Sequence, residues 1–181
     1  MSQLSFVAVD WGTTDFRLWV MDNGGQILNN TQGPFGMSRL KPDDFGRVLE
    51  ESLNKLGVDE EVPVVICGMA GAAQGWYEAP YLTAPTQLET LGHQAVVVPK
   101  TRRCIRILPG VKQMNPANVM RGEETQIAGL LHQSPNFGGT VCLPGTHTKW
   151  VRIADRAITS FETCMTGEQF GFFSKSSVLS H

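Results

Sequence analysis

Alternating and periodic hydrophobic positions divide the first part of the chain into three short strands, a helix and a fourth strand. The runs 4–9, 16–21 and 26–30 predict strands, and the tight turns between them predict an antiparallel meander. Residues 43–57 carry apolar side chains at helical spacing and end on glycine, which predicts an amphipathic helix. Residues 62–67 are mostly β-branched and predict a central strand that can join the sheet in parallel. This order of elements indicates an α/β fold.

The rest of the chain predicts shorter elements. Residues 68–85 are rich in Gly, Ala, Pro and aromatic side chains and predict no regular element, and 111–119 predict a loop around Pro116. The expected elements are strands at 95–98, 105–108, 140–143, 149–153 and 158–163, and helices at 121–131 and 166–179. The strands at 140–143 and 149–153 form a second predicted hairpin.

Composition and charge narrow the function classes. The chain has 181 residues, of which 41% are hydrophobic and 18% charged, which is typical of a folded protein. Its net charge of −2 and the lack of a basic run argue against nucleic acid as a partner. No apolar stretch approaches the roughly 18 residues of a membrane span. The four cysteines form no C-x-x-C pair, so we expect buried thiols in the cytoplasm and no zinc site.

Asp10 follows the first predicted strand and is followed by a Gly-Thr-Thr turn. A carboxylate at a strand end can hold Mg²⁺ directly or through water, because this ion prefers oxygen ligands. Gly12 lets the backbone approach a phosphate without a Cβ in the way, and Thr13 and Thr14 add hydroxyl and N–H donors. The chain contains no P-loop motif. An ordinary polar hairpin turn explains the same residues, so both interpretations stand at this point.

A second Gly-Thr turn lies in the second predicted hairpin, with Gly145, Thr146 and Thr148 at its tip. Successive N–H groups in such a turn can form an anion-binding nest. Two Gly-Thr turns in one chain predict two sides of one phosphate-binding site. For His147 we favour a surface turn residue over a base, and Lys149 fits a solvated charge and a phosphate contact equally well.

A third cluster, Arg121, Glu123 and Glu124, opens a predicted helix. Acidic residues at a helix start are commonly partners of the helix dipole. Alternatively, one of the two glutamates is a general base that takes the proton of a hydroxyl as a bond to phosphorus forms. Arg121 could hold a substrate carboxylate through two parallel hydrogen bonds.

Five motifs occur along the chain in a fixed order. No single motif identifies a family, but the five together do. Together they resemble the 2-dehydro-3-deoxygalactonokinase family, which belongs to the sugar kinase, hsp70 and actin superfamily. The resemblance extends from Phe6 to about Leu179. The motifs are Val-Asp-Trp-Gly-Thr-Thr at 9–14, Gly-Trp-Tyr-Glu-Ala-Pro-Tyr at 75–81, Val-Met-Arg-Gly-Glu-Glu-Thr-Gln at 119–126, Leu-Pro-Gly-Thr-His-Thr-Lys-Trp at 143–150 and Met-Thr-Gly-Glu at 165–168.

The resemblance implies a fold and a reaction. It implies that residues 1–181 form the first, RNase H-like lobe of the fold, a mixed sheet with flanking helices. The family's second, adenosine-binding lobe has no counterpart after Thr166, so the short chain is expected to catalyse poorly. The implied reaction is the ATP-dependent phosphorylation of the 6-hydroxyl of 2-dehydro-3-deoxy-D-galactonate in D-galactonate breakdown.

The resemblance also implies roles for the residues singled out above. Asp10 would organise Mg²⁺, and the two Gly-Thr turns with Lys149 would hold the phosphates of ATP. Glu123 or Glu124 would be the base, while Trp76, Tyr81 and Arg121 would contact the sugar acid. Two alternatives remain: a phosphohydrolase of the same superfamily and a non-catalytic nucleotide-binding module. The oligomeric state is open, with a homo-oligomer as one option.

Overall fold

The structure is a computed structural model that describes residues 4–179. Its internal contacts divide the chain into two compact units. Unit 1 comprises the residues up to Tyr81 together with Thr90–Gly110, and unit 2 comprises Leu82–Glu89 together with the residues from Val111 onward. The assignment of both units to a single N-terminal lobe remains a prediction.

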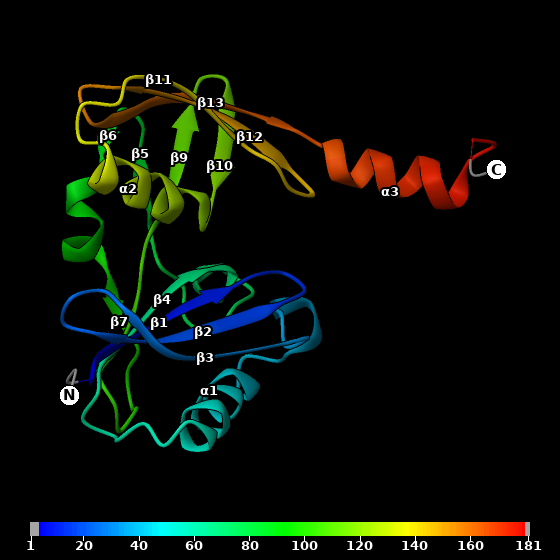
Figure 1. Ribbon diagram of the computed structural model, residues 1–181. Coiled ribbons are helices and arrows are strands. Elements are labelled where there is room, and N and C mark those ends of the chain that lie inside the picture. The colour runs from blue at the N-terminus through cyan, green and yellow to red at the C-terminus, as the bar shows by residue number, and fades with distance from the viewer. Residues whose placement is uncertain (1–3, 180–181) are drawn as a thin grey trace. The chain divides into compact units, whose positions relative to one another are not determined.

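Unit 1 is built on a six-stranded mixed sheet, whose strand order is β3-β2-β1-β4-β8-β7. The strands are β1 (Leu4–Trp11), β2 (Phe16–Asp22), β3 (Ile27–Gly33), β4 (Val64–Gly68), β7 (Val96–Val97) and β8 (Ile105–Ile107). The first three strands pair antiparallel, whereas β1, β4 and β8 are parallel neighbours. The expected meander and the parallel fourth strand are therefore confirmed (Figure 1).

Helix α1 (Asp44–Lys55) covers one face of this sheet (Figure 1). Its apolar side chains recur at helical spacing, so one stripe of the helix enters the core. The buried members of that stripe are Phe45, Val48, Leu49 and Leu53. The helix ends before Gly57, whose φ of +65° favours a residue without a Cβ.

The segment 68–85 is more regular than its composition predicts. It contains a 3₁₀ turn, η2 (Met69–Gly71), and the short strand β5 (Tyr81–Thr83). Strand β5 becomes regular by pairing in a three-stranded sheet of order β10-β9-β5. This pairing is decided by a partner strand distant in sequence, which local composition does not reveal. The 3₁₀ turns η1 (Met37–Arg39) and η3 (Leu88–Gln94) complete the short elements.

The loop expected at 111–119 is wrong. The structure has an antiparallel hairpin there, made of β9 (Gly110–Met114) and β10 (Ala117–Met120). Pro116 lies in the turn and removes no bond from the ladder. The Gln113 side chain donates to the Pro116 carbonyl at 2.8 Å and accepts the Phe161 N–H at 2.9 Å, which ties the hairpin to the neighbouring sheet.

The remainder of unit 2 is a four-stranded sheet with two helices. The sheet has the order β11-β12-β13-β6. Its strands are β6 (Thr86–Gln87), β11 (Gly139–Leu143), β12 (Thr148–Ala154) and β13 (Ala157–Cys164), and the helices are α2 (Glu123–Gln133) and α3 (Thr166–Ser176). The predicted second hairpin and both predicted helices are confirmed. None of the helices among the described residues has the length and apolar character needed to cross a membrane.

One arrangement occurs in both units. Strands β1, β2 and β3 form an antiparallel meander that precedes α1, and β11, β12 and β13 form another that precedes α3. In each meander a Gly-Thr turn joins the first strand to the second. The predicted α/β class with mixed sheets and flanking helices is thus confirmed.

Candidate active site

The first Gly-Thr turn follows strand β1, whose last residue, Trp11, is buried in the core. Trp11 is completely buried, with its ring 4.6 Å from Phe16 and 4.8 Å from Phe45. Its indole N–H donates to the Phe35 carbonyl at 2.7 Å, so the polar edge of this large side chain is satisfied. The packing and the hydrogen bond of Trp11 therefore fix the position at which the turn begins.

The turn itself is polar and exposed. It closes with a bond from the Gly12 N–H to the Asp15 carbonyl at 2.8 Å. Thr13 and Thr14 are exposed, and the Thr14 hydroxyl donates to the Asp15 carboxylate at 2.8 Å. The turn can therefore offer backbone N–H groups to an anion that approaches from solvent.

Asp10 lies at the carboxyl end of β1, beside the end of its parallel neighbour β4. Its Oδ2 accepts a hydrogen bond from Arg17 at 2.9 Å, and 27% of its side chain is exposed. Gly68 has a φ of +90°, and a Cβ there would lie 3.4 Å from Asp10 Oδ1 and 2.5 Å from the Trp11 carbonyl oxygen. The absence of a Cβ at Gly68 therefore leaves space beside the Asp10 carboxylate, at the carboxyl ends of β1 and β4.

A single carboxylate suits Mg²⁺ that keeps several water or phosphate oxygens as ligands. Among residues 4–179, no group of three or more His, Cys, Asp or Glu side chains is arranged to hold a metal ion. Asp10 thus fits an ion that arrives with a phosphate better than one held in a protein cage.

The aromatic loop at 75–81 is tied to the core of unit 1. Trp76 is half-buried, stacks on Phe45 at 6.2 Å and lies 6.3 Å from Trp11. Tyr77 is 42% exposed, while Tyr81 is half-buried at the start of β5. Trp76 therefore has a packing role, and contact of Trp76 and Tyr81 with a sugar acid remains a prediction.

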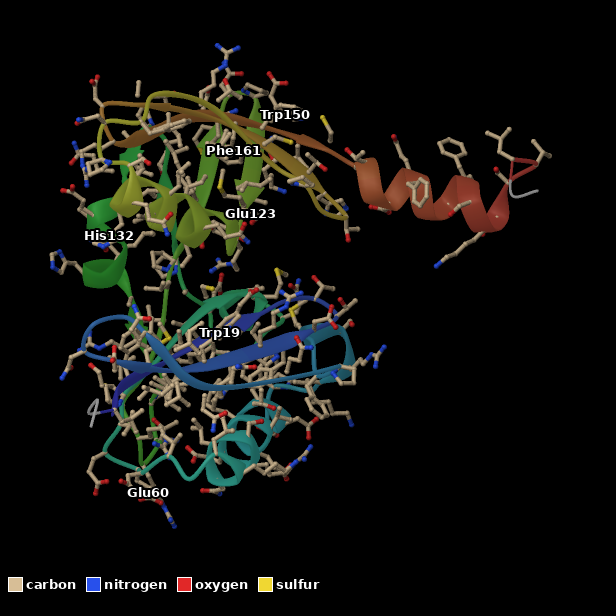
Figure 2. All side chains as sticks on the ribbon, viewed as in Figure 1. Trp19, Glu60, Glu123, His132, Trp150 and Phe161 are labelled. Carbon is tan, nitrogen blue, oxygen red and sulfur yellow. The ribbon has the colours of Figure 1, made fainter. Side chains whose placement is uncertain are left out.

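The two adjacent glutamates at the start of α2 have different surroundings. Glu124 is fully buried, and both of its carboxylate oxygens accept the Gly122 N–H, at 2.8 and 2.9 Å. Glu123 is partly exposed and accepts the Arg121 N–H at 2.9 Å with its Oε2. Its Oε1 lies 3.5 Å from Lys149 Nζ. Figure 2 shows Glu123 at one end of α2 and His132 at the other.

Lys149 is buried, with only 5% of its surface exposed, so its interpretation as a solvated charge is wrong. It follows the second Gly-Thr turn at the start of β12 and faces Glu123. A buried ammonium needs a nearby anion to offset its lost hydration. Glu123 provides one, so within unit 2 the structure brings the helix start and the second turn together.

The tip of the second turn is exposed, whereas Thr148 is buried beneath it. The Gly145 N–H donates to Thr148 Oγ1 at 3.3 Å. His147 is exposed, as expected for a turn residue, and its Nε2 lies 2.6 Å from Glu168 Oε2 in α3. Thr148, whose hydroxyl closes the turn, is therefore fixed in the fold, while the tip of the turn remains accessible to solvent.

Burial raises the pKa of Glu124 from its usual 4.5 to about 7, against the opposing effect of its backbone hydrogen bonds. The folded protein then holds more protons than the unfolded chain between those two values, so this contribution to stability is complete below pH 4.5 and is lost as the pH rises through about 7. We expect the free energy of unfolding to fall by about 2–3 kcal/mol more between pH 5 and pH 8 in the unsubstituted chain than in Glu124→Gln. Urea unfolding at both pH values measures this difference. An equal change in unfolding free energy between pH 5 and pH 8 for the two proteins would contradict the prediction.

The predicted site residues divide between the two units. Unit 1 contains Asp10, the first turn, Trp76 and Tyr81, and unit 2 contains the α2 cluster, the second turn and Lys149. Sequence reasoning missed Ser38, whose hydroxyl donates to the Thr13 carbonyl at 2.8 Å across 25 residues of sequence. No local spacing signals a contact of that range.

Comparisons with known proteins agree on one family. The model of the family described as 2-keto-3-deoxy-galactonokinase matches residues 10–181. A Rhizobium meliloti (strain 1021) protein named "Probable 2-dehydro-3-deoxygalactonokinase DgoK1" is 42% identical over 178 residues, which are 97% of this chain and 58% of that protein. The Escherichia coli (strain K12) 2-dehydro-3-deoxygalactonokinase is 38% identical over 165 residues, 90% of this chain and 54% of that one.

A solved structure extends the likeness to the fold. The crystal structure of a Sinorhizobium meliloti protein described as a 2-dehydro-3-deoxygalactonokinase matches this chain with a TM-score of 0.90 and 42% identity. The match covers 97% of this chain and 58% of that one. The chain thus spans a little more than half the length of the relatives it matches.

Proposed function

Because the chain belongs to the 2-keto-3-deoxy-galactonokinase family, we propose that the protein transfers the terminal phosphoryl group of ATP to 2-dehydro-3-deoxy-D-galactonate in D-galactonate breakdown. The acceptor in this proposal is the 6-hydroxyl. The names of the two curated relatives support the substrate. The expectation of buried thiols is wrong, because Cys104, Cys142 and Cys164 are exposed and Cys67 is half-buried, but cysteines that are free among the described residues fit a reducing cytoplasm.

The observation that carries the proposal is the pair formed by Glu123 and Lys149 beside the second turn. Phosphoryl transfer needs little covalent chemistry from the protein beyond positioning and charge stabilisation. It needs a carboxylate that can take a hydroxyl proton, and cationic or N–H groups that hold the phosphoryl oxygens. Unit 2 supplies both kinds of group within one small cluster.

The surroundings of the two glutamates favour Glu123 as the base. A base must be reachable by the hydroxyl whose proton it takes. The side chain of Glu123 is 23% exposed, whereas Glu124 is completely buried and both of its oxygens accept the same backbone N–H. We therefore assign proton transfer to Glu123 and the fixing of the α2 start to Glu124.

The remaining groups divide between the nucleotide and the sugar acid. Thr13 and Thr14 would bind phosphate oxygens in unit 1, where Gly12 leaves room for the phosphate to approach, and Asp10 would hold Mg²⁺, which neutralises charge on the phosphates when bound. Thr146 and Lys149 would bind phosphate oxygens in unit 2, where Gly145 leaves room for the phosphate and Thr148 holds the turn closed. Arg121 would bind the carboxylate of the sugar acid, because its guanidinium matches that group bidentately. Trp76 and Tyr81 would contact the sugar chain through their exposed edges.

An assay of ADP release tests the proposed function. It is run with and without 2-dehydro-3-deoxy-D-galactonate on this chain and on a chimera that adds the part of the Rhizobium meliloti relative that the match does not cover. ADP release that depends on the sugar acid supports a kinase. Equal ATP hydrolysis without the sugar acid indicates a phosphohydrolase instead, and nucleotide binding without turnover in the chimera indicates a non-catalytic module.

A further inference from the structure

The first Gly-Thr turn is held from its carbonyl side by a segment distant in sequence. The carbonyl oxygens of residues 12, 13 and 14 accept hydrogen bonds from the N–H groups of Met37, Ser38 and Gly36, at 3.0, 2.9 and 3.0 Å respectively. The Ser38 hydroxyl adds a second bond to the Thr13 carbonyl at 2.8 Å. Three consecutive carbonyl groups of the turn therefore accept backbone hydrogen bonds from residues 36–38.

This contact requires a glycine. A Cβ on Gly36 would lie 2.2 Å from the carbonyl carbon of Thr14 and 2.4 Å from the carbonyl oxygen of Thr13. Both are backbone atoms that a rotamer change cannot move away. The absence of a side chain at Gly36 thus allows the close approach of the two backbones.

The second Gly-Thr turn is held in the same way. The Gly167 N–H donates to the Gly145 carbonyl at 3.2 Å, and the Glu168 N–H donates to the Thr146 carbonyl at 3.1 Å. A Cβ on Gly167 would lie 2.6 Å from the Gly145 carbonyl oxygen and 2.9 Å from Thr146 Cα. The contact between Glu168 and His147 at 2.6 Å adds a side-chain bond across the same boundary.

The two holding segments occupy the same place in their meanders. Residues 36–38 follow β3, which ends at Gly33, after a gap of two residues, and residues 166–168 follow β13, which ends at Cys164, after a gap of one residue. We call these two segments the braces. The second brace coincides with the Met-Thr-Gly-Glu motif, for which the proposed function has no role.

The direction of the carbonyl groups determines what the turns offer to a ligand. In a trans peptide the N–H points opposite to the carbonyl of the preceding residue. Since the carbonyls point toward the braces, the N–H groups that follow them point away from the braces, as an anion-binding nest requires. A turn that is already held in this form loses less conformational freedom when it binds.

We propose that residues 36–38 and 166–168 are positioning elements, each of which holds the Gly-Thr turn of its own unit in a form that binds phosphate oxygens. This inference rests on the proposed function, because the phosphate oxygens it names are those of the ATP of that reaction. It assigns to Gly36, Ser38, Gly167 and Glu168 an effect on phosphate affinity without contact with the phosphate.

The second brace is tested with Gly167→Ala against Gly171→Ala. Both glycines lie in α3, but a Cβ on Gly171 meets no atom within 4 Å. Titration of the full chain with MgATP and with inorganic tripolyphosphate is expected to show about tenfold weaker binding for Gly167→Ala, since misplacing a binding group by a fraction of an ångström is costly. Amide hydrogen exchange at residues 145–148 is expected to accelerate in Gly167→Ala and to stay unchanged in Gly171→Ala.

The first brace is tested at Ser38, because Gly36→Ala would displace backbone throughout the turn. Ser38→Ala removes the hydroxyl bond to Thr13, and Ser38→Thr can restore it. We expect Ser38→Ala to weaken MgATP binding about threefold to tenfold and Ser38→Thr to recover most of the affinity. A merely stabilising role would lower the melting temperature and leave the affinity of the folded protein unchanged.

The outcomes separate this inference from the proposed function. If Gly167→Ala matches Gly171→Ala in both affinity and amide exchange, the brace is overturned while the proposed function stands. If the unsubstituted chain binds neither MgATP nor tripolyphosphate at either turn, the phosphate role of the braces is overturned together with the assignment of the turns.

Discussion

Glu123→Gln is expected to lower sugar-dependent ADP release about 10²–10⁴-fold, because glutamine cannot take the proton of the attacking hydroxyl. That loss corresponds to about 3–5 kcal/mol of activation free energy. Glutamine has nearly the same shape and keeps an oxygen that can accept the Arg121 N–H, which Glu123 accepts at 2.9 Å. The substitution also removes the anion that faces buried Lys149, so the melting temperature of the variant is measured beside its rate and rates are compared only for folded protein. The measurement is the coupled ADP assay on the chimera, at saturating concentrations of both substrates.

Two further variants make this result specific. Glu162→Gln is a matched control, since Glu162 is an exposed carboxylate on β13, and it should leave the rate unchanged. Glu124→Gln should act mainly on the stability of the α2 start and only mildly on the rate. A large loss in Glu124→Gln with a mild one in Glu123→Gln would reverse the assignment, and mild effects in both would remove the pair from proton transfer.

Arg103→Met is expected to cost about 3–5 kcal/mol of unfolding free energy, through the loss of several hydrogen bonds of one buried guanidinium at once. The Arg103 side chain is only 1% exposed and its Nη2 lies 3.3 Å from a carboxylate oxygen of Glu50. Its guanidinium also donates to the backbone carbonyls of Asp59, Val62 and Val58. Methionine fills much of the volume but leaves these carbonyl groups without their donor. The arginine therefore joins the loop after α1 to the segment before β8.

The neighbouring arginine is the natural control for this prediction. Arg102 is 87% exposed on its side chain and forms an exposed ion pair with Glu60 at 3.5 Å. Arg102→Met should change the unfolding free energy by less than about 1 kcal/mol, as is usual for such pairs. Urea unfolding followed by tryptophan fluorescence measures both variants, since Trp11, Trp19 and Trp76 lie in unit 1. A cost below about 1 kcal/mol for Arg103→Met would contradict the account of its buried contacts.

Local patterns were sufficient where an element depends on its own residues. The three-strand meander follows from alternation and tight turns, and α1 follows from a stripe of apolar residues that ends before Gly57. The hairpin at 110–120 shows the limit of this reasoning. Its two strands become regular by pairing with each other and, for β9, with β5, and the proline in the turn disguised the pattern.

The candidate site shows the same division. The Gly-Thr turns, the acidic helix start and the aromatic loop were visible as motifs, because chemistry that binds anions needs particular residue types close together in sequence. The difference between Glu123 and Glu124 was not visible, since adjacent residues of one type differ only in what surrounds them. The burial of Lys149 opposite Glu123 was equally hidden.

The sequence by itself determined the kinds of elements in this protein, the family to which it belongs and the residue types available for chemistry, because these depend on neighbours along the chain. Only the tertiary structure decided which glutamate is reachable, that Arg103 is buried among backbone carbonyls, and that Ser38 and Gly167 lie behind the two turns. Those features depend on burial and on contacts across many residues. Such contacts come into existence only when the strands and helices pack.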